Sequence, residues 1–231
     1  MKANIIYIES HAKSREAAKN CLQSCEKFGI MDAELVGGIT PASLSYIEDL
    51  YPIKPVPNSR AYAYETEQQP MYHTKKSCFF NHVLFWERVA AANEPMTFLE
   101  HDAICVREYD YPEFDEVLVL NLDAAFRHNK NLWKKHAYSY IYKDEQTTVR
   151  PLVSSLKYWK DNDFKNGYLI PGTAAYAITP KGASRLLDSM WANGWDQSDF
   201  FINSKNVNIE YADPQYFNFS GPNMSTSKGF K

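Results

Sequence analysis

Two carboxylates, Glu100 and Asp102, directly follow the apolar run of residues 96–99. Such a run is typical of a short buried strand, and ligands of open α/β sheets bind just beyond the carboxyl ends of the strands. Acids separated by one residue at such a place can hold Mn²⁺ or Mg²⁺, and the cation in turn can hold phosphate oxygens. The pattern therefore predicts a site for a phosphorylated ligand. The alternative is a pair of solvated acids at the end of a strand.

Positive and aromatic side chains provide two further candidate sites. Lys76 lies at the start of a predicted helix, residues 74–93, and the N-terminus of a helix binds phosphate favourably. A solvated lysine without a ligand is an equally good interpretation. Residues 127–143 interleave Lys134 and Lys135 with Trp and Tyr. Such a stretch can track a phosphate backbone and stack on bases, hold an anionic glycan, or form an ordinary solvated face.

The elements that must position these residues alternate between strands and helices. Apolar runs predict strands at residues 4–8, 33–36, 96–99, 117–120, 174–178 and 207–211. Helical spacing predicts helices at residues 14–28, 74–93 and 180–194, the last with Thr179-Pro180 as its start. Residues 52–72, with four prolines, are predicted to be a long irregular loop. A strand–helix–strand order predicts parallel crossovers.

Composition limits the possible classes of protein. The chain has 231 residues, 45% of them hydrophobic, which suits one large α/β domain. A net charge of −3 provides no overall basic field for nucleic acid or an anionic membrane. No apolar stretch approaches the length of a signal or a spanning helix, so we expect a cytoplasmic protein, in a bacterial or phage-infected host cytosol. The four cysteines are too few for a disulfide scaffold.

Three stretches together resemble the family 25 glycosyltransferases, which include lipooligosaccharide and procollagen galactosyltransferases. The first runs from Ser77 to Trp86 and keeps the Cys78, His82 and Trp86 of the family pattern. The second is residues 98–103, where His101 replaces the middle acid of Glu-Asp-Asp-Ala. The third, residues 172–183, matches the family's Gly-Thr-x-x-Tyr strand and its Lys-Gly-Ala helix.

The resemblance implies a Rossmann-like A-type glycosyltransferase domain over residues 1–231, with a mixed, mostly parallel sheet. Residues 1–125 would bind the donor, residues 126–215 would face the acceptor, and residues 216–231 would form a flexible tail. It further implies a nucleoside-diphosphate sugar as donor, usually Mn²⁺, and inversion at the anomeric carbon. A glycan or a hydroxymethylated DNA base, of the kind some bacteriophages glycosylate, would be the acceptor. We expect no integral membrane contact.

The family pattern also suggests roles for individual residues. Asp102 is the expected metal ligand, and Glu100 the expected second ligand or donor contact. Inversion requires a base for the acceptor hydroxyl. Asp196 and Asp199 are the candidates, and Asp199 is preferred because it precedes the apolar residues 200–202. Both acids could instead merely cap and charge the start of a helix.

Other residues are expected to contact substrates. Those expected to bind the donor are His82, Arg15, Lys76, Gly172 and Thr173. His82 could equally be a core histidine. Trp195, with Lys134 and Lys135, is expected on the acceptor side. Two other classes stay open: a non-catalytic sugar- or nucleotide-binding module, permitted by His101, and a metal-dependent hydrolase, which would need a second ligand cluster that the sequence lacks.

Overall fold

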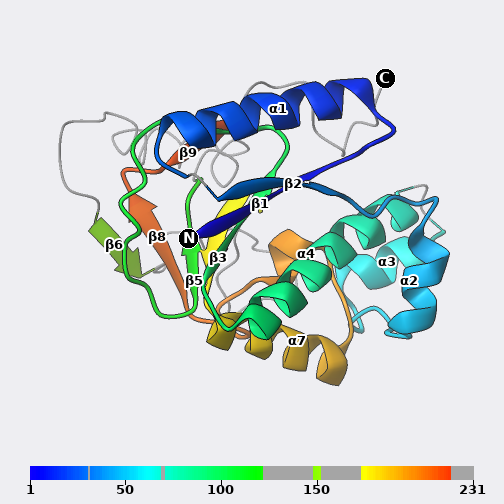
Figure 1. Ribbon diagram of the computed structural model, residues 1–231. Coiled ribbons are helices and arrows are strands. Elements are labelled where there is room, and N and C mark those ends of the chain that lie inside the picture. Colours follow the sequence, from blue (N-terminus) through cyan, green and yellow to red (C-terminus); the bar gives the residue numbers. More distant parts are fainter. Residues whose placement is uncertain (31, 69–70, 122–147, 152–172, 220–231) are drawn as a thin grey trace, which may run out of the picture.

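The fold is built on a seven-stranded sheet with helices on both faces. The structure is a computed structural model that describes residues 1–30, 32–68, 71–121, 148–151 and 173–219. Strand order is β2-β1-β3-β7-β5-β8-β6 (Figure 1). Strands β2, β1, β3, β5 and β8 run in one direction, while β7 and β6 run the opposite way. The expected α/β fold with a mixed, mostly parallel sheet is confirmed.

Most of the predicted elements are present with small changes at their ends. The strands of the main sheet are β1 (Lys2–Tyr7), β2 (Ala33–Gly37), β3 (Met96–Glu100), β5 (Val117–Val119), β6 (Thr148–Pro151), β7 (Ala175–Ile178) and β8 (Ile209–Asp213). A second, two-stranded sheet pairs β4 (Ala103–Cys105) with β9 (Phe217–Phe219). The helices are α1 (Ala12–Lys27), α2 (Leu44–Leu50), α3 (Arg60–Thr66), α4 (Tyr72–Ala92), α7 (Pro180–Asn193) and α8 (Ser198–Phe201).

The loop predicted for residues 52–72 is corrected, because part of it is helical. Helix α3 begins after Ser59, whose hydroxyl accepts a hydrogen bond from the backbone nitrogen of Tyr62. Helix α2, which precedes this region, is also absent from the sequence-based prediction. Helix α1 likewise begins earlier than predicted, with His11 rather than Ser14 as its N-cap. Helices α2 and α3 are too short to give a clear periodic pattern of apolar residues in the sequence.

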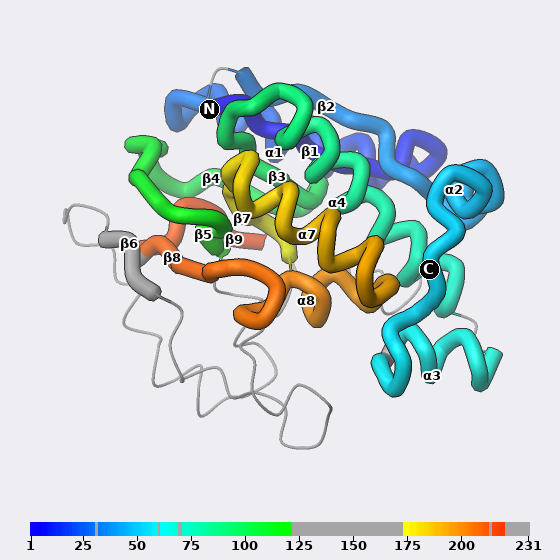
Figure 2. Tube along the Cα trace, turned by 90° about the horizontal axis from the view of Figure 1, so that it is seen from below, coloured from blue at the N-terminus to red at the C-terminus, as the bar shows by residue number. Residues whose placement is uncertain are grey.

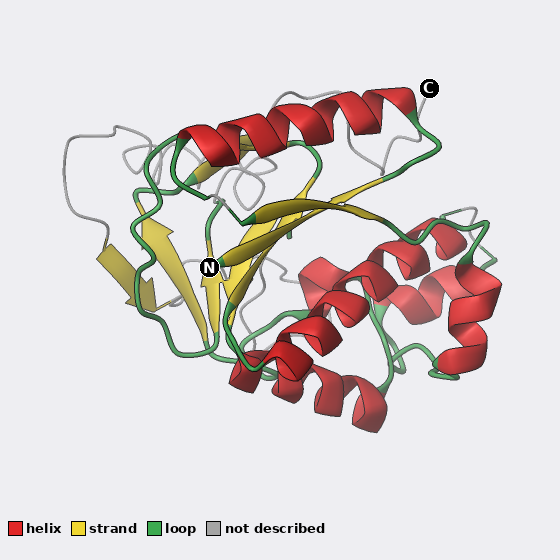
Figure 3. Ribbon diagram, in the orientation of Figure 1, coloured by secondary structure: helices red, strands yellow, loops and turns green. Residues whose placement is uncertain are grey.

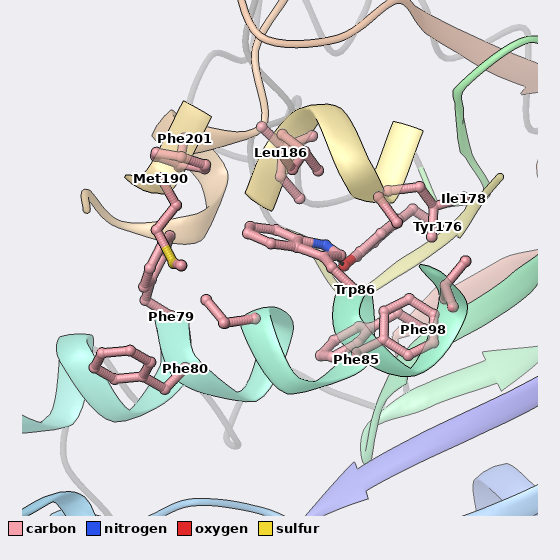
Figure 4. Close-up of a cluster of buried hydrophobic side chains, with 14 of the residues drawn as sticks. Phe79, Phe80, Phe85, Trp86, Phe98, Tyr176, Ile178, Leu186, Met190 and Phe201 are labelled. Carbon is pink, nitrogen blue, oxygen red and sulfur yellow. Dashed lines mark hydrogen bonds between the residues drawn. The ribbon is translucent and has the colours of Figure 1, made fainter. Parts of the chain in front are cut away.

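Two hydrophobic cores lie on the two faces of the sheet. Helix α1 covers one face and helices α4 and α7 cover the other (Figures 1 and 3). Helices α4 and α7 pack side by side along their length (Figure 2). The core beneath them is rich in aromatic side chains, and Trp86 of α4 is fully buried among them (Figure 4). This core fixes the ends of β3, β7 and α8 relative to one another.

A buried carboxylate joins β5 to α7, away from the predicted ligand edge. Both oxygens of Glu116 accept hydrogen bonds from Arg185 at 2.8 Å, and one accepts from the backbone nitrogen of Asn208 at 2.7 Å. Burial alone would raise the pKa of Glu116, but hydrogen bonds from Asn208, Arg185 and Lys181 outweigh it and lower the pKa. A carboxyl group whose pKa is lower in the folded protein stabilises the fold above its unfolded pKa.

Glu116→Gln is therefore expected to destabilise the protein at neutral pH, by about 1–3 kcal/mol, because it removes a charged acceptor of several hydrogen bonds. The loss should shrink as the pH falls from the unfolded pKa, about 4.3, through the lower pKa of the folded protein, because the wild-type carboxylate is then protonated. Urea unfolding at several pH values measures both effects. A variant equally stable at pH 7, or one whose deficit grows on acidification, would contradict this account of Glu116.

Candidate active site

The ends of several strands place polar residues at one edge of the sheet. Strands β1 and β3 are parallel, with Ile6 opposite Glu100, so their carboxyl ends lie together. Strand β7 runs the other way, and the backbone nitrogen of Glu100 donates to Ala174 at 2.7 Å. Thr173 therefore lies one residue beyond this contact, at the same edge. The carboxyl end of β5 is also here, since Leu120 donates to Ala175.

Glu100 is an acid at this edge whose pKa is strongly perturbed. It is partly buried, and among the described residues no hydrogen bond reaches its carboxylate. Burial raises the pKa of Glu100 well above its usual value, and the negative charges of Asp102 and Asp199 raise it further. The ammonium group of Lys75, in the first turn of α4, acts in the opposite direction. The fold thus brings the charges of Lys75 and Asp199, which are distant in sequence, close enough to act on Glu100, beside its near neighbour Asp102.

Asp102 and His101 form the turn between β3 and β4. Asp102 is only 6% exposed, and its charge acts on Glu100 and also on Cys21 of α1. His101 is 8% exposed, and burial, with a smaller contribution from His11, lowers its pKa to about 4. His101 is therefore neutral at physiological pH. No hydrogen bond reaches its Nε2 among the described residues.

The two candidate bases have different surroundings. Asp199 lies in the first turn of α8, partly buried, and its charge acts on Glu100. Asp196 is 1% exposed, and its Oδ1 accepts hydrogen bonds from the backbone nitrogens of Ala61, at 3.0 Å, and Gln197, at 2.8 Å. Asp196 thereby ties the first turn of α3 to the segment before α8. This geometry supports a structural role for Asp196 and does not support it as the base.

Lys76 and Trp195 are also buried and contact other residues of the fold. The ammonium group of Lys76 lies 2.6 Å from a carboxylate oxygen of Glu48 and 3.3 Å from the hydroxyl of Tyr72. It also lies over the ring of Trp195, 5.7 Å from the centroid. Lys76 is 6% exposed and Trp195 is fully buried. Both side chains thus have partners within the fold, their expected substrate contacts stay predictions, and Lys75 is the lysine whose charge acts on Glu100.

His82 is buried in the core instead of lining a cavity. It is 2% exposed, and its ring stacks on Phe98 with the centroids 4.0 Å apart. Its Nδ1 lies 3.0 Å from the hydroxyl of Tyr176, and its Nε2 lies 3.3 Å from the hydroxyl of Thr173. Burial lowers the pKa of His82 to about 3. The expected contact of His82 with the donor stays a prediction, and in the structure its ring reaches Thr173, which lies at the edge.

Of the remaining predicted site residues, one lies on the surface and the others lie outside the described residues. Arg15 is exposed in the first turn of α1, and its guanidinium donates to the backbone oxygen of Glu9, beyond the carboxyl end of β1. Gly172, Lys134 and Lys135 lie outside the described residues. The predicted acceptor-side basic stretch therefore has no described geometry.

Asn81 has a role at this edge that the sequence did not reveal. Its side-chain oxygen accepts from the backbone nitrogen of Ile39 at 2.6 Å, and its nitrogen donates to the oxygen of Ile39 at 3.2 Å. A Cβ on Gly38 would lie 3.2 Å from the backbone oxygen of Tyr7, tighter than ordinary contact. In the sequence, the Gly37-Gly38 pair after β2 was the feature that could have indicated this close approach. It lets the β2–α2 loop pack tightly against β1 and α4.

The sequence matches the family described as glycosyltransferase family 25 (LPS biosynthesis protein) over residues 4–202. The protein is therefore a glycosyltransferase. More particularly, the chain belongs to glycosyltransferase family 25. No curated protein matches it significantly.

Several solved structures share features of the fold at low identity. Mouse xyloside xylosyltransferase 1, in its apo form, is 10% identical over 86% of this chain and 78% of its own, with a TM-score of 0.38. A putative glucose-1-phosphate thymidylyltransferase from Bacillus anthracis, in complex with sucrose, is 11% identical over 100% and 94%, with a TM-score of 0.45. The galactosyltransferase LgtC, in complex with donor and acceptor sugar analogues, is 9% identical over 91% and 73%, with a TM-score of 0.39. At these TM-scores the functional conclusion rests on the family match alone.

Within the part of the chain that the structure describes, no helix combines the length and apolar character needed to cross a membrane.

Proposed function

We propose that the protein transfers a sugar, with inversion, from a nucleoside-diphosphate sugar to a hydroxyl acceptor, assisted by Mn²⁺ or Mg²⁺. The observation that carries this proposal is the group of acids at the end of β3, where burial raises the pKa of Glu100 and the charges of Asp102 and Asp199 raise it further. Acids that raise one another's pKa form a site prepared for positive charge. A divalent cation and an oxocarbenium-like sugar both supply such charge.

The residues present fit a hard divalent cation that is shared with the substrate. Carboxylate oxygens are the ligands that Mn²⁺ and Mg²⁺ prefer, and Asp102 and Glu100 would hold the ion. Across the described ranges, no group of three or more His, Cys, Asp or Glu side chains is arranged so that it could hold a metal ion by itself. Diphosphate oxygens and water would complete the shell, as is usual where a metal holds substrate phosphates. When bound, the cation would neutralise charge on the departing nucleoside diphosphate.

The other side chains at this edge would orient the substrates and move one proton. Asp199 would accept the proton of the acceptor hydroxyl as that oxygen attacks the anomeric carbon. Its partial burial limits the water around the carboxylate. Lys75 would attract the diphosphate, and Thr173 would contact the donor at the end of β7. The donor half would be residues 1–125, with the acceptor entering beside residues 126–215.

The hydroxyl acceptor would be a glycan or a hydroxymethylated DNA base. A base in a duplex would have to be flipped out before its hydroxyl could reach Asp199. The two acceptors are separated by offering each with the same donor and measuring sugar incorporation. Salt-sensitive DNA binding that is lost in a Lys134→Ala, Lys135→Ala variant would favour DNA.

The proposed function is tested by a thermal-shift panel of nucleotide sugars, each with and without MnCl₂. A ligand that binds the native state raises Tm by mass action, so the cognate donor should give the largest shift, and only when the metal is present. UDP-galactose heads the panel because of the family resemblance. A panel without any metal-dependent shift, together with absent turnover, would overturn the proposal.

Asp102→Asn should reduce turnover at least about a hundredfold with the fold intact, because it removes a metal ligand. The metal-dependent part of the donor-induced Tm shift should be lost in the same variant. Asp49→Asn, on the exposed face of α2, is the matched control and should behave as wild type. Initial rates across a MnCl₂ titration, with circular dichroism of each variant, provide the measurement. Unchanged metal dependence in Asp102→Asn would remove this residue from the metal site.

A further inference from the structure

A chain of hydrogen bonds runs from the aromatic core to the edge of the sheet. The indole nitrogen of Trp86 donates to the hydroxyl of Tyr176 at 3.0 Å, and Figure 4 shows this nitrogen directed at the oxygen. The Tyr176 hydroxyl lies 3.0 Å from Nδ1 of His82, and Nε2 of His82 lies 3.3 Å from the hydroxyl of Thr173. All four side chains are 5% exposed or less.

The partners of Tyr176 fix the direction of this chain. An indole nitrogen can only donate, so Tyr176 accepts from Trp86. Tyr176 is fully buried, and among the described residues its hydroxyl has His82 as its one other partner. If Nδ1 of His82 carried the proton, the phenolic proton would be left without an acceptor, at a cost of about 1–3 kcal/mol. The arrangement in which every group is satisfied has Tyr176 donating to Nδ1.

The same reasoning extends to Thr173. A neutral imidazole whose Nδ1 accepts must carry its proton on Nε2. His82 therefore donates to the oxygen of Thr173, and the hydroxyl proton of Thr173 remains to be donated elsewhere. The pKa of His82, lowered by burial to about 3, keeps the ring neutral, so this direction does not reverse at physiological pH. Without Tyr176, the ring could change tautomer and Thr173 could donate back to it.

We propose that Tyr176 and His82 are positioning residues that hold the hydroxyl of Thr173 as a hydrogen-bond donor aimed into the donor site, beside Glu100. One hydrogen bond places Thr173 at this edge: the backbone nitrogen of Glu100 donates to the backbone oxygen of Ala174, the neighbour of Thr173, at 2.7 Å. The recognised atom would be an oxygen of the bound nucleotide sugar, and this part of the inference rests on the proposed function.

The tautomer of His82 can be measured without any substrate. Nitrogen-15 NMR distinguishes protonated from unprotonated ring nitrogens, and the wild type should show a protonated Nε2 and an unprotonated Nδ1 from pH 5 to 8. Tyr176→Phe removes the donor to Nδ1 and should give a mixture of tautomers, whereas Thr173→Val should keep the wild-type tautomer. A protonated Nδ1 in the wild type, or a Tyr176→Phe spectrum equal to wild type, would overturn the proposal even if the protein proved inactive.

Donor affinity provides the second test, with UDP-galactose and MnCl₂ as the probe. Thr173→Val should raise the donor KM about tenfold, the effect of one lost hydrogen bond, with a smaller change in kcat, and Thr173→Ser should restore it. Tyr176→Phe should raise KM by a similar factor. The double variant should be no worse than Thr173→Val alone, since both changes remove the same interaction.

A packing control separates positioning from simple loss of stability. Phe85 contacts the ring of Tyr176, with the centroids 6.0 Å apart, and takes no part in the hydrogen-bond chain. Phe85→Leu should lower Tm and leave the donor KM at the wild-type value. Two results would show that Tyr176 acts only through packing. One is that the effects of Thr173→Val and Tyr176→Phe on the donor KM add up in the double variant. The other is that Phe85→Leu raises the donor KM as much as Tyr176→Phe does. Failure of UDP-galactose to bind the wild type would instead count against that donor, and the tautomer measurement would still decide the positioning role.

Discussion

Replacing Asp199 with asparagine is expected to abolish sugar transfer while leaving the affinity for the nucleotide-sugar donor nearly unchanged. Asparagine keeps the shape of the side chain but cannot accept the proton that the acceptor hydroxyl loses during attack. Loss of a general base typically costs about 10²–10⁴ in rate. An interaction needed only in the transition state lowers kcat and kcat/KM together. Single-turnover product formation and donor binding by calorimetry measure the two quantities separately.

Asp188→Asn, on the exposed face of α7, is the matched control and should retain wild-type turnover. A further readout does not depend on activity. The charge of Asp199 raises the pKa of Glu100, so Asp199→Asn should lower that pKa, as carboxyl-carbon NMR of the ligand-free protein would show. Full activity in Asp199→Asn would place the base elsewhere at this edge.

The parts of the fold that the sequence predicted are those with local signals. The helix that begins at Pro180 was identified by Thr179, whose hydroxyl accepts from the backbone nitrogen of Gly182, and by proline in the first turn. Strand β3 was identified by its apolar run and lies, as predicted, within the sheet. Glu100 was expected at the end of this strand because the apolar run stops there, and it is the last residue of β3.

The parts that the sequence did not predict depend on distant partners. Asp196 was a candidate base from its place in the sequence. Its Oδ1, however, accepts a hydrogen bond from the backbone nitrogen of Ala61, which lies 135 residues away along the chain. Lys76 could not be separated from Lys75 by sequence, because its burial depends on Glu48 and Trp195. Residue type and spacing identify which groups are chemically able to act. Only the packing of α2, α3 and α4 determines which of them face the site.

The same packing explains why His82 is buried and reaches the edge of the sheet only through Thr173. A histidine on an apolar helix face is expected either to reach a ligand or to be satisfied inside the core. Here both descriptions hold in part, since His82 is satisfied by Tyr176 and Thr173, and Thr173 lies at the edge. Three residues of the family pattern, His82, Thr173 and Tyr176, are thus one hydrogen-bonded unit.

A cost in stability is expected where acids are concentrated for function. The pKa of Glu100 is higher in the folded protein than in the unfolded chain, so the folded state disfavours the ionised carboxylate. For such a group, stability is greatest below the unfolded pKa, about 4.3, and falls as the pH rises through the range between the two pKa values. At neutral pH, without a cation or donor, Glu100 therefore destabilises the fold.

Glu100→Gln should consequently change stability and activity in opposite directions. Without the charge repelled by Asp102 and Asp199, the ligand-free variant in EDTA should have a higher Tm than wild type at pH 8, and the difference should vanish near pH 4. Turnover should fall by about a hundredfold, because the carboxylate that would hold the cation or donor is gone. Glu16→Gln, exposed on α1, is the matched control for both measurements. A variant that is less stable in EDTA at pH 8, or that is stabilised yet fully active, would mean that the negative charge at this edge serves neither the metal nor the donor.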